Sequence, residues 1–255
     1  MPEFETQPDL DHVLWMGGSP CSGKSTISHI LAQQYALTLY HVDDAMGTHF
    51  QNLDPARHPT LIRWLGSTWD ERWMHPLDQL VQEAIACYSE HFTLVVADVL
   101  ALPRTTPVLI EGTALLPRLL ARLGVKSSQA LWVIPEGEFQ RAHYAQRSWM
   151  RDILADCADP ETAFHNWMER DARFARWVAG EAADLGYETL LVDGKRTVDE
   201  NAHTVAARIE PRWRGVMGLT AWASRSPSWY GEGRGFTTAS ARPSGWRASP
   251  RRSRA

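Results

Sequence analysis

Cysteine, lysine and long apolar runs are all scarce in this chain of 255 residues. Its three cysteines are odd in number and widely spaced, which argues against a disulfide framework and against a zinc site. No uninterrupted apolar run reaches the roughly 18 residues that span a bilayer. The first residues also lack the basic-then-apolar layout of a signal peptide. We therefore expect a cytoplasmic protein with no membrane partner.

The net charge of −4 hides an uneven distribution along the chain. Residues 212–255 carry nine arginines and one acid, which leaves −12 on residues 1–211. An acidic body argues against a nucleic-acid-binding enzyme surface, so polyanions are expected only at the tail. Because the tail is rich in Arg, Ser, Gly and Trp without a period of 2 or 3.6, we expect it to be disordered. An RNA-binding arm is the alternative.

We expect the chain to consist of three parts: an extension over residues 1–11, one domain over 12–211 and the tail over 212–255. Within the domain, short apolar runs without polar alternation predict five buried parallel strands. They are Val13–Met16, Leu37–Val42, Val108–Ile110, Ala130–Ile134 and Thr189–Val192. Helical patterns lie between them, the longest running from Pro76 to Pro103. The fold class is therefore α/β, with a five-stranded parallel sheet and helices on both faces.

The segment Gly18-Ser19-Pro20-Cys21-Ser22-Gly23-Lys24-Ser25 fits the pattern G-x-x-x-x-G-K-[ST] between a predicted strand and a predicted helix. Its glycines let successive backbone N–H groups turn inward and surround phosphate oxygens at the helix N-terminus. Residues 18–26, Thr26 included, are the expected nucleotide-binding residues. Lys24 would reach the β- and γ-phosphates of ATP, and the Ser25 hydroxyl would ligate Mg²⁺. A glycine turn with an incidental lysine is the alternative.

Ligands of parallel sheets bind at the carboxyl ends of the strands, where acidic residues follow two of the predicted strands. Asp43 and Asp44 come after the second strand, and an acid there can take the proton of a phosphate acceptor. Either could instead cap the next helix. Glu111 follows the third strand and could hold Mg²⁺ through water, orient the acceptor or act as a cap.

Arginines follow the fourth strand, where guanidinium groups can stabilise a phosphoryl group in transfer. Arg147 and Arg151 are four residues apart on one predicted helical face, and we expect them to close over the nucleotide. Arg141, Arg170 and Arg173 are alternatives, and a solvated face of ion pairs is the simpler interpretation. Residues 46–75 are rich in Trp, Arg and His. They suit the binding of a small acceptor, or the tryptophans pack a helical cap on the core.

The order of these motifs resembles the P-loop kinases of the nucleoside-monophosphate-kinase-like group, which includes shikimate and gluconate kinases, chloramphenicol phosphotransferase and zeta toxins. The resemblance covers residues 12–210 and rests on four features. They are the Gly-Gly-Ser-Pro-Cys-Ser-Gly-Lys-Ser-Thr loop, Val-Asp-Asp, Leu-Ile-Glu-Gly and an arginine-bearing lid. The resemblance implies a P-loop fold with a helical cap and lid. It matches Asp43 to the acceptor-side base and Arg147 or Arg151 to the lid arginine. The two-arginine acceptor signature of true nucleoside monophosphate kinases is missing.

These observations predict an ATP- and Mg²⁺-dependent phosphotransferase that acts on a small-molecule hydroxyl or phosphate. An NTP hydrolase and a non-catalytic nucleotide-binding regulator are the alternatives. The guanine motif Asn-Lys-x-Asp of GTPases and the Leu-Ser-Gly-Gly signature of transporter ATPases are both absent from the sequence. The acceptor and the oligomeric state stay open.

Overall fold

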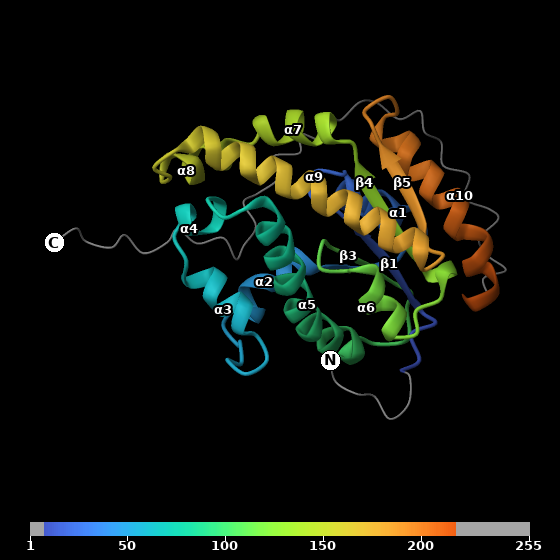
Figure 1. The fold of residues 1–255 in the computed structure, drawn as a ribbon. Coiled ribbons are helices and arrows are strands. Elements are labelled where there is room, and N and C mark those ends of the chain that lie inside the picture. Colours follow the sequence, from blue (N-terminus) through green and yellow to red (C-terminus); the bar gives the residue numbers. More distant parts are fainter. Residues whose placement is uncertain (1–7, 218–255) are drawn as a thin grey trace.

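The computed structural model describes residues 8–217, which form an all-parallel sheet of five strands flanked by helices (Figure 1). The strands lie in the order β2-β3-β1-β4-β5, with bounds β1 Val13–Gly18, β2 Thr38–His41, β3 Val108–Glu111, β4 Ala130–Pro135 and β5 Glu188–Val192. Apolar residues occupy these short segments almost without interruption, as expected for strands covered on both faces. The predicted α/β class and five-stranded parallel sheet are confirmed.

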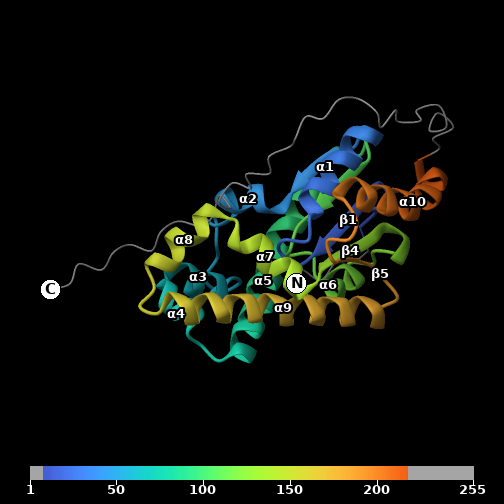
Figure 2. The same cartoon turned by 90° about the horizontal axis from the view of Figure 1, so that it is seen from above.

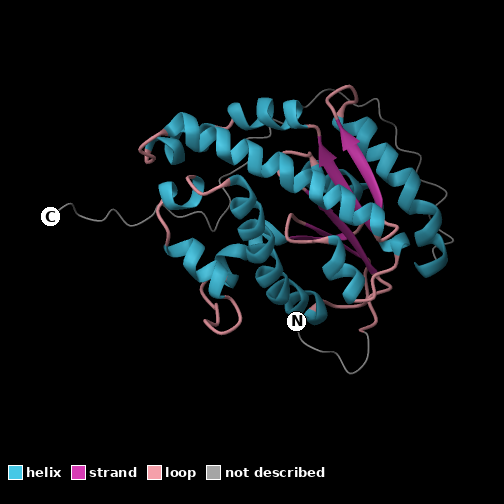
Figure 3. Ribbon diagram, viewed as in Figure 1, coloured by secondary structure: helices cyan, strands magenta, loops and turns pink. Residues whose placement is uncertain are grey.

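Helices connect the strands as crossovers, and several extend past the carboxyl edge of the sheet (Figure 3). They are α1 Lys24–Tyr35, α2 Val42–His49, α3 Pro59–Gly66, α4 Trp69–Trp73, α5 Leu77–Ala101, α6 Pro117–Arg122, α7 Gly137–Ala145, α8 Ser148–Ala155, α9 Pro160–Asp184 and α10 Val198–Met217. The long helix predicted between Pro76 and Pro103 is α5.

Alternate strand residues face opposite sides of the sheet and build two separate cores. Trp15, Ile110 and Trp132 face the side that α5, α6 and α9 cover. Met16 and Val133 face the side that α1 and α10 cover. Figure 2 shows α1 and α10 on one side of the sheet and α9 on the other. The helices therefore lie on both faces, as predicted.

A third apolar cluster joins α4 to α7, α8 and α9 beyond the carboxyl edge of the sheet. Trp73 stacks on Trp167 with ring centroids 4.3 Å apart, and both indoles are fully buried. Trp69 is also buried there, whereas Trp64 lies against the Arg72 guanidinium at 4.1 Å. These tryptophans of the predicted acceptor region therefore pack the helical layer itself.

Several predicted element boundaries move by a few residues. The second strand ends at His41 instead of Val42, because Val42 is already the first residue of α2. This places Asp43 and Asp44 in the first turn of α2, where carboxylates interact favourably with the helix dipole. Each of the other four strands is one or two residues longer than predicted.

The expectation that Arg147 and Arg151 share one helical face is wrong. Helix α7 ends at Ala145, and Arg147 is the extended N-cap residue of α8, with φ −82° and ψ 114°. The chain therefore turns between the two helices. Arg147 packs its guanidinium against the Tyr144 and Trp149 rings, whose centroids are 5.1 and 5.6 Å away. This stacking stabilises the turn.

Helix α10 continues through the predicted domain boundary at residue 211 and ends at Met217. The remainder of the predicted tail lies outside the described residues, as does most of the predicted extension over residues 1–11. Helix α5 has the length and apolar composition of a membrane-spanning helix, and 44% of its most apolar window is buried inside the protein. Its buried residues, Phe92 and Val95 among them, belong to the core beside the sheet.

Candidate functional site

The loop from Gly18 to Ser25, hereafter the glycine loop, has a backbone shape that most residues avoid. Gly18, Cys21 and Gly23 have φ angles of 139°, 61° and 80°. A Cβ on Gly18 would lie 2.1 Å from the Val133 carbonyl oxygen, so only glycine fits there. Cys21 is the exception, because a non-glycine residue with positive φ is strained by about 1 kcal/mol or more. Such alternation of backbone conformation builds a concave nest of N–H groups.

The amides of this nest are free to bind an anion. Within residues 8–217, no group accepts a hydrogen bond from the backbone N–H of residues 21–26. Lys24 opens α1 from inside the nest, and although it is only 6% exposed it forms no ion pair with a described residue. Free amides and a buried ammonium at a helix N-terminus together favour a phosphate group.

The parallel register places a carboxylate beside this nest. Glu111 ends β3 and pairs with Met16 of β1 on one side and with His41 of β2 on the other. Its Oε1 accepts hydrogen bonds from the Ser25 hydroxyl at 3.0 Å and from His41 Nδ1 at 2.9 Å. Glu111 is 1% exposed, and its second oxygen, Oε2, has no hydrogen-bond partner within the described chain. That oxygen is therefore available to a ligand.

The carboxyl groups of Glu111 and Asp43 have pKa values that are shifted in opposite directions. Burial by itself raises the pKa of Glu111, but the hydrogen bond from His41 and the charge of Lys24 outweigh it, so the pKa lies below its ordinary value. Burial raises the pKa of Asp43, and the positive charge of Lys24 only partly offsets this. Glu111 is thus the stable anion, and Asp43 is the stronger base of the two.

Asp43 and Asp44 differ in environment although they are neighbours in α2. Asp43 is half-buried and lies within electrostatic range of Lys24, Glu111 and His41. Asp44 is exposed to solvent. Only the first of the two predicted acids therefore turns toward the glycine loop.

His41 is a further residue of this site, and no sequence motif indicates it. Burial lowers the pKa of its imidazole less than the hydrogen bond to Glu111 raises it, so the net pKa is raised. Its ring stacks on His29 of α1 at 4.8 Å, and His29 Nδ1 donates to the Ser25 carbonyl oxygen at 3.0 Å. The signal that could have found it is positional, since the last residues of adjacent parallel strands lie side by side.

Helices α7 and α9 hold the glycine loop from the side opposite α2. Gln140 of α7 is buried and donates to Ser19 Oγ at 3.1 Å and to the Pro20 carbonyl oxygen at 2.7 Å. Ser19 Oγ in turn donates to the Asp171 carbonyl oxygen of α9 at 3.4 Å. Arg170 and Asp171 form a buried ion pair, with Nε and Oδ1 2.6 Å apart but not aligned as a hydrogen bond.

The predicted arginines divide between the site and the surface. Arg147 is half-buried and its charge reaches Cys21 of the glycine loop, where it partly opposes the burial that raises the pKa of that thiol to about 11. Arg151 is exposed on α8. Of the alternative residues, Arg170 is buried beside the loop, whereas Arg173 pairs with Asp78 at the surface, 2.6 Å away.

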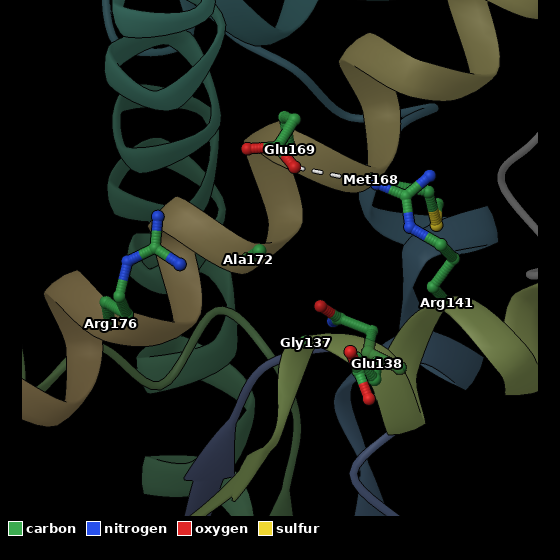
Figure 4. A pocket seen from close by; sticks show the side chains of 8 residues that line it. Gly137, Glu138, Arg141, Met168, Glu169, Ala172 and Arg176 are labelled. Carbon is green, nitrogen blue, oxygen red and sulfur yellow. Dashed lines mark hydrogen bonds and ion pairs between the residues drawn. The ribbon is translucent and has the colours of Figure 1, made fainter.

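A cavity of about 260 Å³ lies beside the glycine loop, between α7 and α9 (Figure 4). Its wall includes Arg141 and Glu169, whose charged groups are 3.5 Å apart, together with Arg176 and Glu138. Gln140, which lines this cavity, also donates hydrogen bonds to the glycine loop. Because the free amides, Lys24 and Glu111 are not in this wall, we assign the functional site to the glycine loop.

No family model matches this chain, and a search of curated proteins found no match. The functional assignment therefore depends on the geometry of the site. The structure brings Lys24, Ser25, Asp43 and Glu111 together at the carboxyl ends of β1, β2 and β3, with Arg147 at the rim. Arg151, the other predicted arginine, is exposed on α8 and forms no ion pair with a described residue.

Proposed function

We propose that this chain is an ATP-dependent phosphotransferase with a P-loop NTPase fold, and that it transfers the γ-phosphate to a small-molecule acceptor. The observation that carries the proposal is the nest of six free amides around buried Lys24, next to the Ser25–Glu111 pair. A triphosphate satisfies all of these groups at once, because it supplies the acceptors and the negative charge that they lack.

The donor set beside Ser25 fits Mg²⁺. Ser25 Oγ and the unpartnered Glu111 Oε2 supply two protein oxygens, and Mg²⁺ is usually held by few protein ligands together with phosphates and waters. The described residues contain no group of three or more His, Cys, Asp or Glu side chains that could hold a metal by themselves. A bound Mg²⁺ would neutralise phosphate charge. His41 would hold Glu111 in place while Ser25 turns from the carboxylate toward the ion.

Asp43 would act on the acceptor. Its carboxylate, more basic than usual because it is buried, takes the proton of the attacking hydroxyl. The acceptor oxygen forms a bond to the γ-phosphorus, and the bond between that phosphorus and the β,γ-bridging oxygen breaks, so that ADP leaves. Lys24 and Arg147 compensate the charge on the phosphoryl oxygens during transfer.

Mass spectrometry of a metabolite mixture tests this function. The mixture is incubated with protein, ATP and Mg²⁺, and we expect one compound to gain the mass of a phosphate group. Lys24→Ala should nearly abolish this turnover and weaken ATP binding, with an unchanged circular dichroism spectrum, because Lys24 contacts ligand instead of the core. The matched control is Lys126→Ala, since Lys126 pairs with Asp11 at the surface.

The outcomes separate the proposal from its alternatives. Release of inorganic phosphate without a phosphorylated product would favour an NTP hydrolase. ATP binding without turnover would favour a non-catalytic regulator. Equal ATP affinity and turnover in the Lys24→Ala and Lys126→Ala variants would remove the glycine loop from the function.

A further inference from the structure

A polar network joins β2, α2 and α5 through the Asp98 carboxylate. One oxygen of Asp98 on α5, Oδ2, accepts a hydrogen bond from the Tyr40 hydroxyl at 2.6 Å and another from His49 Nε2 at 2.9 Å. The other ring nitrogen of His49, Nδ1, lies 2.9 Å from Nε2 of His91, which is about two turns before Asp98 on the same face of α5. His49 and His91 are 6% and 3% exposed.

The proton positions in this network follow from its chemistry. An ionised carboxylate only accepts hydrogen bonds, so His49 carries a proton on Nε2 and Tyr40 keeps its phenolic proton. Burial and the bond to Asp98 raise the pKa of Tyr40, which keeps the phenol a donor. Burial and the charge of His49 lower the pKa of His91 to about 3, so His91 is neutral around pH 7.

The two donors to Asp98 lie at the two ends of the segment from Tyr40 to His49. Tyr40 is the residue before His41 at the end of β2, and His49 is the last residue of α2. Between them lie His41, which holds Glu111, and Asp43, which faces Lys24. The start of α2 is fixed separately, because Val42 packs so closely on Gly112 that a Cβ there would come within 2.4 Å of it.

We propose that Asp98 is a positioning residue, which fixes both ends of the segment from Tyr40 to His49 through one carboxylate oxygen and so sets the place of Asp43 at the site. The catalytic part of this inference rests on the proposed function. The described contacts of Asp98 are to Tyr40 and His49, so it would act on the site through these two residues. Its side chain is 44% exposed, so removing it leaves no cavity in the core.

The test compares two Asp98 variants with a control on the same helix. Asp98→Ala removes the accepting oxygen. Asp98→Asn keeps an oxygen that can accept both hydrogen bonds but lacks the charge. Its properties should therefore lie closer to those of the wild-type chain than the properties of Asp98→Ala do. Glu83→Ala is the matched control, because Glu83 of α5 forms an ion pair with Arg63 of α3 at 3.2 Å. All are made in the full chain.

Three measurements are made on each variant: amide hydrogen exchange, the affinity for a fluorescent ADP analogue, and release of inorganic phosphate from ATP with water as acceptor. For Asp98→Ala we expect exchange over residues 41–48 to rise about ten- to a hundredfold, since a charge-assisted hydrogen-bond pair is lost. Phosphate release should fall roughly ten- to a hundredfold because a displaced base acts poorly. ADP affinity should stay within about twofold, as the glycine loop is untouched.

Unchanged exchange over residues 41–48 in Asp98→Ala would overturn the proposal. So would faster exchange with phosphate release equal to that of Glu83→Ala, because Asp98 would then stabilise the segment without positioning the reaction. If the wild-type chain neither binds the ADP analogue nor releases phosphate, the proposed function fails and the catalytic part of the inference fails with it. The exchange data still decide whether Asp98 fixes the segment.

Discussion

Single residues at the glycine loop show how environment separates two carboxylates that have similar intrinsic acidity. Glu111 receives hydrogen bonds from Ser25 and His41, which stabilise its anion against burial. Asp43 is half-buried, and the charge of Lys24 only partly offsets the effect of burial, so its pKa is raised. Pairs of titratable groups whose environments move their pKa values apart are typical of sites that need one fixed anion and one proton acceptor. In the proposed function, this division suits Glu111 to the metal side and Asp43 to the base.

Asp43→Asn should lower transfer to the acceptor by roughly 10²–10⁴-fold, because the amide keeps the shape but cannot take a proton. ATP affinity should barely change, since Lys24 and the loop amides remain. In the wild-type chain, transfer should be complete above the raised pKa of Asp43 and lost as pH falls through it. Transfer rate and nucleotide affinity, measured against pH once the acceptor is known, check both statements.

Asp44→Asn is the internal control for this substitution. Asp44 is exposed in the first turn of α2, so its removal should cost a few tenths of a kcal/mol of helix stability and leave transfer intact. Full transfer by the Asp43 variant would show that Asp43 takes no part in the reaction, and Glu111 would become the candidate base.

Among the elements, the sequence predicted those that bury long apolar patterns. The five strands and α5 were recognisable because uninterrupted apolar runs and three- to four-residue periods have few alternative structures. The glycine loop was recognisable because its backbone shape demands glycine at Gly18. Lys24 and Ser25 follow from the pattern G-x-x-x-x-G-K-[ST], and Asp43 and Glu111 follow from the rule that parallel sheets bind ligands at one edge.

Other features depend on tertiary contacts that a linear pattern does not contain. His41 became a site residue through its register with Glu111 across two strands. The turn at Arg147 depends on stacking with Tyr144 and Trp149, so helical periodicity predicted one face where the chain breaks into two helices. The Tyr40–Asp98–His49 network joins three elements and has no spacing of its own.

The packing of α2 on α5 should make the fold sensitive to acid through His91. The unfolded chain binds a proton at His91 near the ordinary pKa of 6.5, whereas the folded chain binds it only near 3. The contribution of neutral His91 to the free energy of unfolding is therefore fully present above about pH 6.5. It is lost as the pH falls toward 3, by up to about 1.4 kcal/mol per pH unit. Urea unfolding at pH 7 and pH 5 should show a loss of about 2 kcal/mol that His91→Gln lacks.

His165→Gln is the matched control, because His165 of α9 is exposed. Its loss of stability between pH 7 and pH 5 should equal that of the wild-type chain. If His91→Gln loses as much stability on acidification as the control, the acid sensitivity comes from other groups, and His91 is not the neutral member of the network.

In the molecule as a whole, three apolar clusters account for the arrangement of the layers. Two of them lie on the faces of the sheet, and the third joins α4 to α7, α8 and α9 beyond its carboxyl edge. Asn166 of α9 donates to the Trp73 carbonyl oxygen at 2.8 Å, and the Ala158 N–H donates to Asp70 at 2.9 Å. The two sides of the site are therefore linked directly by the Trp73–Trp167 stack and these hydrogen bonds.

A chain ending at Met217 should keep the thermal midpoint and the nucleotide affinity of the full chain. All five strands, the helices on both faces of the sheet and every group of the candidate site lie within residues 8–217. A chain ending at Pro211 removes the last six residues of α10 and tests whether the end of that helix contributes to packing on α1. We expect the 1–211 chain to melt a few degrees lower, since about 1 kcal/mol shifts the midpoint by roughly 2–4 °C in a protein of this size.

Thermal unfolding measures the melting temperature of each chain, and titration with a fluorescent ADP analogue measures its nucleotide affinity. A large fall in melting temperature already at 1–217 would mean that residues 218–255 pack on the domain, and the fold would then extend past α10.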